Sequence, residues 1–182
     1  SKDFKDHKHT LAAHKPNVLL AFFGFNESFA GPAGVAKFEQ DLEGFLKAPQ
    51  NIDNYSTARS NWDKTADKTT DLAPLPMLRK IVLVSPIAHE NLKRHGLPDG
   101  VKTNENLKLY TQVLLRVAAR HKVVCVDLFN PTLKAMADAK QPLTINGVHL
   151  NEHGDQVVGE ILDRALFGLP TKAQNEQKTD LS

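Results

Sequence analysis

Three short apolar runs stand out along the chain, and each has the continuous pattern of a strand that is buried on both faces. They cover residues 18–23, 81–84 and 123–126. Each run follows a polar stretch that contains Lys or Arg, and each is followed by Gly, Ser-Pro or Asp, which signal a turn. Continuous rather than alternating apolar runs are typical of parallel strands. The pattern therefore predicts a parallel sheet.

Around these runs, apolar residues recur with the period of an amphipathic helix. The repeats extend through residues 35–46, 107–117 and 157–166. Asn104 and Asn151 precede the second and third repeats, and each is predicted to cap its helix because Asn is favoured at that position. Strands that alternate with helices indicate a layered α/β fold with right-handed crossovers. We therefore expect a three-layer α/β/α architecture.

The length of 182 residues suits a single domain, which we expect to cover residues 1–170. Residues 48–78 interrupt the alternation and are rich in Asn, Asp, Thr, Lys and Pro, so they are interpreted as a surface insertion of the kind that borders binding sites. Residues 171–182 are predicted to form a polar tail.

Composition excludes several classes of partner. The formal net charge is +2 and the chain has no long run of Lys or Arg, so a nucleic-acid partner is not expected. A single cysteine rules out a disulfide framework and a cysteine-based zinc site. No apolar run approaches the ~20 residues of a membrane-spanning helix.

A polar turn follows the first predicted strand at Gly24-Phe25-Asn26. Ligands of an open parallel sheet bind beyond the carboxyl ends of its strands. Gly24 permits a sharp turn there, and Asn26 offers a neutral amide donor of the kind that stabilises a developing oxyanion. The alternative is that Asn26 merely tolerates a left-handed turn conformation.

A histidine lies in a loop just before the last predicted helix. His149 follows Gly147. Imidazole is the side chain that most often serves as a general base in enzymes. A loop histidine can also be exposed without a catalytic role. We apply that interpretation to the other seven, with His89 the least certain: His7, His9, His14, His89, His95, His121 and His153.

In this order and strand context, the two segments resemble the SGNH (GDSL-like) hydrolases, which are serine esterases and acylhydrolases with a flavodoxin-like α/β/α fold. Gly24-Phe25-Asn26-Glu27 is similar to the family's third block, Gly-x-Asn-Asp, with Glu27 in place of Asp. Residues 146–149 (Asn-Gly-Val-His) are similar to its fifth block, Asp-x-x-His, with Asn in place of Asp. The resemblance extends over residues 16–166. Two longer strings, Gly-Phe-Asn-Glu-Ser-Phe-Ala-Gly and Ser-Pro-Ile-Ala-His-Glu-Asn, resemble an esterase-like branch of large, planctomycete-type bacterial proteins.

The resemblance implies a serine ester hydrolase, acylhydrolase-like or carbohydrate-esterase-like, with Asn26 in the oxyanion hole and His149 as base. Gly24, which begins the same block, is a further candidate site residue. Asn146 would occupy the orienting position, where its carbonyl oxygen can hold the imidazole but supplies no charge. Asp127 is a second candidate for that charge, with a structural turn role as the alternative. The resemblance implies no metal or organic cofactor, a small-molecule or carbohydrate ester as substrate, a secreted or periplasmic location and a larger multidomain chain.

The family's nucleophile has no good counterpart. No Gly-Asp-Ser follows a first strand; Ser28 and Ser85 lie at unsuitable positions, and Ser56 and Ser60 fall in the insertion. The resemblance therefore implies a fold that is incomplete at its N-terminus and a chain that is inactive alone. It also implies that the strand at 18–23 forms an exposed apolar edge and makes the chain poorly soluble.

Two other functions stay open. Residues 149–153 (His-Leu-Asn-Glu-His) fit the inverted zinc-protease motif H-x-x-E-H, which needs both histidines on one helix. The neighbouring glycines favour a loop instead. The second alternative is a non-catalytic binding module that keeps the esterase-like fold, and Asn at position 146 and the missing serine favour it.

Overall fold

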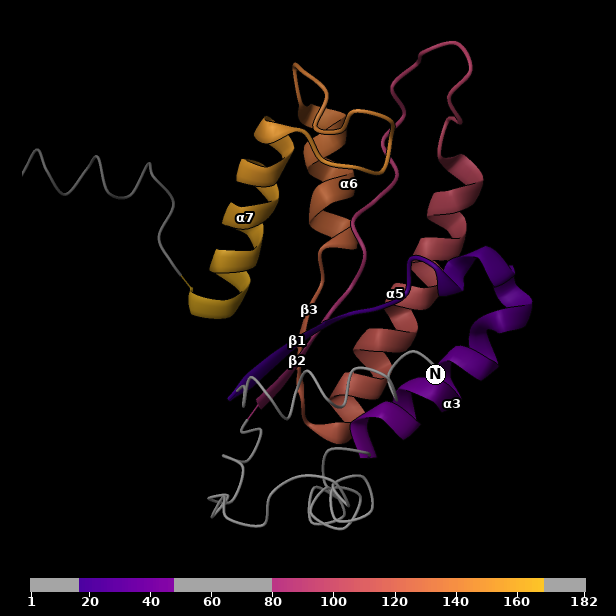
Figure 1. Ribbon diagram of the computed structural model, residues 1–182, viewed down its shortest axis with the longest axis vertical. Coiled ribbons are helices and arrows are strands. Elements are labelled where there is room, and N and C mark those ends of the chain that lie inside the picture. Colours follow the sequence, from indigo (N-terminus) through magenta and orange to yellow (C-terminus); the bar gives the residue numbers. More distant parts are fainter. Residues whose placement is uncertain (1–16, 48–79, 169–182) are drawn as a thin grey trace, which may run out of the picture.

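The structure, a computed structural model, describes residues 17–47 and 80–168 (Figure 1). The predicted insertion at 48–78 and tail at 171–182 lie outside these residues. The described part contains one sheet of three parallel strands in the order β1-β2-β3. These are β1 (Val18–Phe22), β2 (Lys80–Val84) and β3 (Val124–Val126). The predicted strands and their parallel arrangement are confirmed.

The helical elements of the described residues are η1 (Glu27–Gly34), a 3-10 segment, and α3 (Val35–Lys47), α5 (Val101–His121), α6 (Phe129–Asp138) and α7 (Glu152–Phe167). The three apolar repeats correspond to α3, α5 and α7, so those predictions are confirmed. The sequence pattern did not predict η1 or α6, because each is short and buries few side chains of its own.

One predicted helix cap is confirmed and the other is wrong. The Asn151 side chain accepts a hydrogen bond from the Gly154 N–H at 2.8 Å and caps α7. Asn104 instead lies inside α5, which begins at Val101. Its amide exchanges two hydrogen bonds of 2.8 Å with the backbone N–H and carbonyl of His89. The Asn104 side chain therefore binds the backbone of a residue distant in sequence, His89, and does not cap a helix.

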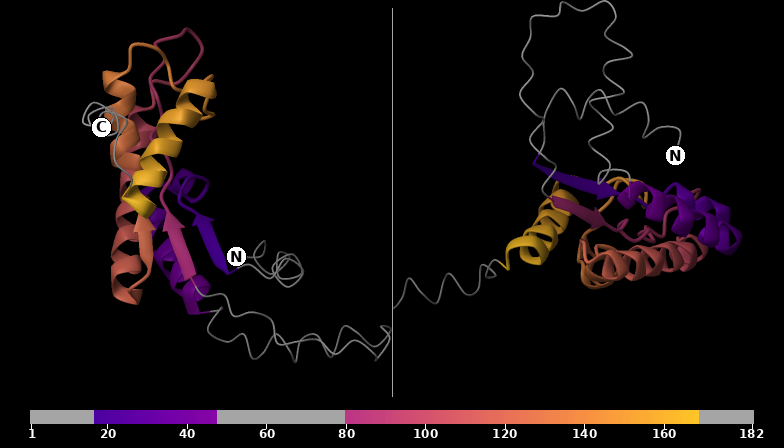
Figure 2. Two further views of the ribbon diagram at one scale, coloured as in Figure 1. Left: turned by 90° about the vertical axis from the view of Figure 1, so that its left-hand side faces the viewer. Right: turned by 90° about the horizontal axis from the view of Figure 1, so that it is seen from below.

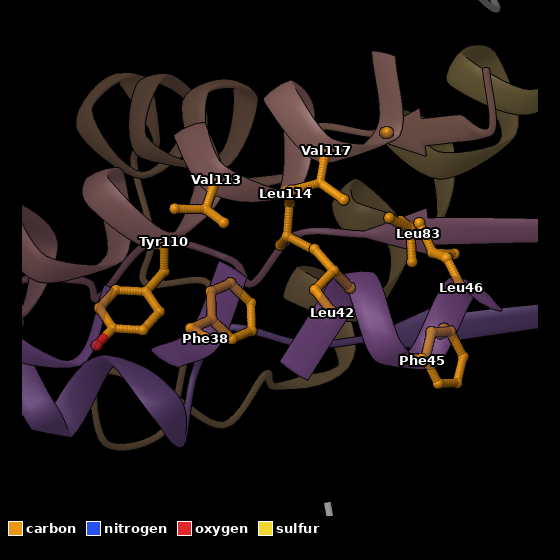
Figure 3. Close-up of a cluster of buried hydrophobic side chains, with 11 residues drawn as sticks. Phe38, Leu42, Phe45, Leu46, Leu83, Tyr110, Val113, Leu114 and Val117 are labelled. Atoms are coloured by element: carbon orange, nitrogen blue, oxygen red, sulfur yellow. The ribbon is translucent and has the colours of Figure 1, made fainter. Parts of the chain in front are cut away.

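Helices α3 and α5 cover one face of the sheet. Their side chains interdigitate with those of β2 in a closely packed core (Figure 3). Tyr110 of α5 is fully buried, lies 5.0 Å from the Phe38 ring centroid and donates its hydroxyl hydrogen to the Gly31 carbonyl at 2.9 Å. This core fixes η1, and with it the turn after β1, against α5. The residues of this core that Figure 3 labels are Phe38, Leu42, Phe45, Leu46, Leu83, Tyr110, Val113, Leu114 and Val117.

Helix α7 covers the other face of β2 and β3. Val82, Val84 and Val126 are buried there beneath apolar residues of α7. The same face of β1 is open: Val18, Leu20 and Phe22 are 51%, 41% and 58% exposed. Among the described strands β1 pairs with β2 alone. Within residues 17–47 and 80–168, β1 is therefore an edge strand of the sheet with an open apolar face. Such an edge promotes association with other chains.

Candidate functional site

Gly24 forms the sharp turn that ends β1. Its φ is +105°, a left-handed value that disfavours any residue with a Cβ. A Cβ at this position would also lie 3.2 Å from Pro86 Cδ. The Gly24 N–H donates to Glu27 Oε2 at 2.9 Å. The predicted turn is confirmed, and because this N–H is already bonded, Gly24 supplies conformation rather than a free oxyanion donor.

Asn26 follows the turn and opens η1. Its φ and ψ are −64° and −39°, in the right-handed helical region. The alternative interpretation, that Asn26 is there to tolerate a left-handed conformation, is therefore wrong. The residue is exposed, and its side chain makes no capping hydrogen bond to η1. The amide is thus presented to solvent at the carboxyl end of β1.

His149 lies in a closed loop that precedes α7. The Ile145 N–H donates to the His149 carbonyl at 2.9 Å, and the Asn151 N–H donates to the Leu143 carbonyl at 3.0 Å. These bonds join the two arms of the loop, which we call the histidine loop (residues 143–151). His149 is exposed and lies outside the helix. Its predicted loop position is confirmed.

The structure brings Asn146 and His149 into direct contact. Asn146 Oδ1 accepts hydrogen bonds from the backbone N–H groups of Val148 (3.2 Å) and His149 (3.0 Å). Two donors fix the oxygen's position, because a flipped amide would set its NH₂ group against them. His149 Nδ1 lies 3.1 Å from Oδ1 and 3.0 Å from Nδ2 of the same amide. Asn146 therefore contacts the ring at the nitrogen that an orienting residue would hold.

Neither serine of the described residues is available to attack a substrate. Ser28 is 2% exposed, and its hydroxyl donates to the Phe25 carbonyl at 2.6 Å. Ser85 is fully buried, and its Oγ accepts from the backbone N–H groups of Leu128 and Phe129 at the start of α6. Burial raises the pKa of the Cys125 thiol to about 11, so that group is also a poor nucleophile near neutrality.

Asp127 has a structural partner. Its carboxylate accepts from the Asn130 N–H at 3.1 Å and from the Asn130 side-chain amide at 2.5 Å, at the first turn of α6. The turn role is thus the one the geometry supports.

The histidines of the H-x-x-E-H string do not share a helix. His149 lies in the histidine loop, whereas His153 belongs to the first turn of α7. Within residues 17–47 and 80–168, no three His, Cys, Asp or Glu residues are grouped as metal ligands would be. The helical geometry that the zinc motif needs is therefore missing.

The segment after β2 links the two candidate sites. Pro86 lies beside the Gly24 turn, since its Cδ would be 3.2 Å from a Cβ on Gly24. Further along, the Glu90 N–H donates to the Gly147 carbonyl of the histidine loop at 2.8 Å. Figure 2 shows all three strands pointing toward the end of the molecule where this segment and the histidine loop lie. No hydrogen bond among the described residues joins Asn26 to His149 directly.

Sequence reasoning missed Glu90 and Thr144, which hold the histidine loop by buried hydrogen bonds. A charged and a hydroxyl side chain at such positions look like surface residues. The available signal was the string Ser-Pro-Ile-Ala-His-Glu-Asn at residues 85–91, which contains Glu90.

Comparison with known proteins gives the fold. No protein-family model matches the chain. A GDSL esterase/lipase, WDL1 from rice (Oryza sativa subsp. japonica), is 26% identical over 157 residues, covering 84% of this chain and 54% of its own length. The chain thus spans about half the length of that curated relative.

Several solved structures share the architecture. A lipase/acylhydrolase from Enterococcus faecalis has a TM-score of 0.56 at 21% identity, covering 91% of this chain and 68% of its own. The acetyl xylan esterase AlAXEase has a TM-score of 0.58 at 17% identity, covering 90% and 74%. The acetylxylan esterase Axe2 from Geobacillus stearothermophilus has 0.55 at 14% identity, covering 91% and 67%.

The chain has the α/β fold of these lipase/acylhydrolase and acetylxylan esterase structures. The predicted fold class is therefore confirmed. None of the described helices has both the length and the apolar character needed to cross a membrane.

Proposed function

We propose that this chain supplies the general base and the oxyanion donor of a serine ester hydrolase. The observation that carries the proposal is the contact between Asn146 and His149, made on a closed loop at the carboxyl end of an esterase-type sheet. Asn26 lies exposed after β1, at the same end of the sheet. Similarity to a GDSL esterase/lipase and to acylhydrolase structures supports the same chemistry.

In the proposed reaction, a serine outside the described residues attacks the acyl carbon of an ester. His149 Nε2 takes the serine proton and returns it to the departing alcohol. The Asn26 amide stabilises the negative charge on the carbonyl oxygen of the tetrahedral intermediate. Water, activated by the same imidazole, then hydrolyses the acyl-enzyme.

This role requires one tautomer of His149. For Nε2 to accept a proton, Nδ1 must carry the hydrogen and donate it to Asn146 Oδ1, which lies 3.1 Å away. The amide orients the ring, but unlike a carboxylate it supplies no charge to stabilise the imidazolium. We therefore propose that His149 is positioned like the histidine of a catalytic triad. Its imidazolium is stabilised less than one that is paired with a carboxylate.

We propose a small acyl ester as substrate, with acetylated carbohydrate as the first class to test. Two of the structural neighbours are acetylxylan esterases by name, and the sequence resembles an esterase-like branch of planctomycete-type proteins.

A non-catalytic binding module is the second candidate. The buried, hydrogen-bonded state of Ser28 and Ser85 and the amide at Asn146 favour it. The two functions differ in one measurable property, because a binding module retains ester ligands without turnover.

Replacing Asn26 by alanine tests the proposal. Loss of one oxyanion donor is expected to lower kcat about 10²–10³-fold and to leave KM little changed, since the charge develops only in the transition state. The measurement is hydrolysis of an aryl acetate by the product of the complete open reading frame. Asn17→Ala is the matched control, because Asn17 is also exposed but precedes β1 at the opposite end of the sheet. Equal rates for the Asn26→Ala variant and the wild type would contradict the proposed role.

A further inference from the structure

A buried carboxylate holds the arm of the histidine loop nearest α6. Glu90 follows β2 and is 6% exposed. Its Oε2 accepts hydrogen bonds from the Thr144 backbone N–H at 2.7 Å and from the Thr144 hydroxyl at 2.5 Å. Its two carboxylate oxygens also accept from the Leu143 N–H, at 3.0 and 3.1 Å. Every one of these donors belongs to the first two residues of the loop.

The hydrogen bonds continue from Thr144 to the middle of the loop. The Gly147 N–H donates to Thr144 Oγ1 at 3.0 Å, while the Gly147 carbonyl accepts from the Glu90 N–H at 2.8 Å. Gly147 directly follows Asn146, whose side chain contacts His149. A continuous path of bonded groups therefore runs from the Glu90 carboxylate to the Asn146–His149 pair.

The His89 ring closes the other side of the loop. His89 is 8% exposed, and a Cβ on Gly147 would lie 2.6 Å from its Nε2. Gly147 also has a φ of +97°. Gly100, with a φ of +76°, would place a Cβ 2.8 Å from His89 Cδ2. The ring therefore fits between two glycines, and the backbone at Gly147 cannot move toward it.

The Glu90 carboxylate has no cationic partner among the ion pairs of the described residues. Burying a carboxylate is costly unless hydrogen-bond donors compensate it. Here the compensating donors are two backbone N–H groups and one hydroxyl, all in the loop. The hydrogen bonds that compensate burial of the Glu90 carboxylate therefore require one conformation of that loop.

We propose that Glu90, acting through the Thr144 hydroxyl, is a positioning residue that sets the tautomer and placement of His149. The inference rests on the proposed function of His149 as a base. A hydroxyl that donates to Glu90 must accept from Gly147, so the direction of each bond is fixed along the path. The path ends at the Gly147 backbone, directly after Asn146, whose Oδ1 and Nδ2 lie 3.1 and 3.0 Å from His149 Nδ1. In this proposal, the loop conformation that Glu90 holds favours the contact of Oδ1 with a protonated Nδ1 over the contact of the NH₂ group with a bare one.

The test uses three substitutions in the full chain. Thr144→Val keeps the size of the side chain and removes the hydroxyl, whereas Thr144→Ser keeps the hydroxyl. Glu90→Gln keeps the shape but replaces one acceptor oxygen by an NH₂ group that faces the Leu143 N–H. Histidine ¹⁵N NMR of the labelled protein reports which nitrogen of His149 carries the proton.

We expect the wild type and Thr144→Ser to show the Nδ1–H tautomer, and Thr144→Val and Glu90→Gln to show a mixture of both tautomers. In the active enzyme, the latter two should lower kcat about 10–10²-fold with little change in KM, since a misplaced base affects the chemical step. Melting curves identify the variants that are folded at the temperature of the spectra, and Glu90→Gln serves as the test if Thr144→Val is unfolded.

A wild-type tautomer in folded Glu90→Gln and Thr144→Val proteins would overturn the proposal, because a merely structural role would lower the melting temperature alone. The NMR result does not depend on turnover. A wild type without esterase activity whose variants still lose the Nδ1–H tautomer would therefore count against the proposed function, while supporting the role of Glu90.

Discussion

Replacing His149 by alanine is expected to lower kcat/KM for ester hydrolysis by at least about 10³-fold, because removal of a base that serves a serine nucleophile removes most of its activation. His149 is exposed, so the same change should alter stability by no more than about 0.5 kcal/mol. The loss should appear in kcat, with KM little affected. Steady-state kinetics with an aryl acetate and the product of the complete open reading frame provide the measurement.

His153→Ala is the matched control for that experiment. His153 is exposed, lies four residues further along and belongs to α7 rather than to the histidine loop. An esterase that uses His149 as base should retain its activity when His153 is replaced by alanine. A zinc hydrolase built on the H-x-x-E-H string should lose activity with either histidine, together with bound metal. Equal loss in both variants would therefore contradict the proposed mechanism.

The largest expected effect on stability comes from Gly154→Ala at the start of α7. A Cβ there would lie 1.9 Å from the Leu143 carbonyl oxygen, a backbone atom that cannot rotate away. The helix would have to separate from the histidine loop, and such overpacking costs at least about 2 kcal/mol. Because Leu143 also donates to Glu90, the separation should disturb the loop that carries His149.

Gly159 provides an internal control in the same helix. A Cβ at Gly159 would have no atom within 4 Å, so Gly159→Ala should stabilise α7 by up to about 1 kcal/mol through helix propensity. Urea denaturation of both variants measures the two effects with opposite expected signs. A Gly154→Ala protein as stable as the wild type would show that the contact between α7 and Leu143 is not as close as described.

The sequence could predict those parts of the fold that local pattern determines. The three strands are continuous apolar runs, and α3, α5 and α7 each repeat apolar residues at helical spacing. Helix α6 was not predicted, because one of its two buried residues is the polar Thr132 and the helix therefore lacks an apolar repeat. The Thr132 hydroxyl accepts from the Ala88 N–H at 2.9 Å, a partner 44 residues away that no local pattern reveals.

The site divides in the same way. Gly24, Asn26, Asn146 and His149 could be selected as candidates because each lies beside a strand end or a helix start, where the sequence has short recognisable strings. The prediction that Asn104 caps a helix was wrong because its side-chain amide binds the backbone of His89 instead. Glu90 was missed because its donors lie 53 and 54 residues further along the chain. Tertiary contacts over such separations leave no periodic signal.

Identification of the nucleophilic serine is the sharpest test of the proposal that His149 serves as the base of a serine ester hydrolase. A fluorophosphonate forms a stable adduct with an activated serine, and peptide mapping of the labelled product of the complete open reading frame identifies that residue. We predict one labelled serine outside residues 17–47 and 80–168, with labelling slowed at least about 10³-fold by His149→Ala. Labelling of Ser28 or Ser85, or an unchanged labelling rate in the His149→Ala protein, would contradict the account.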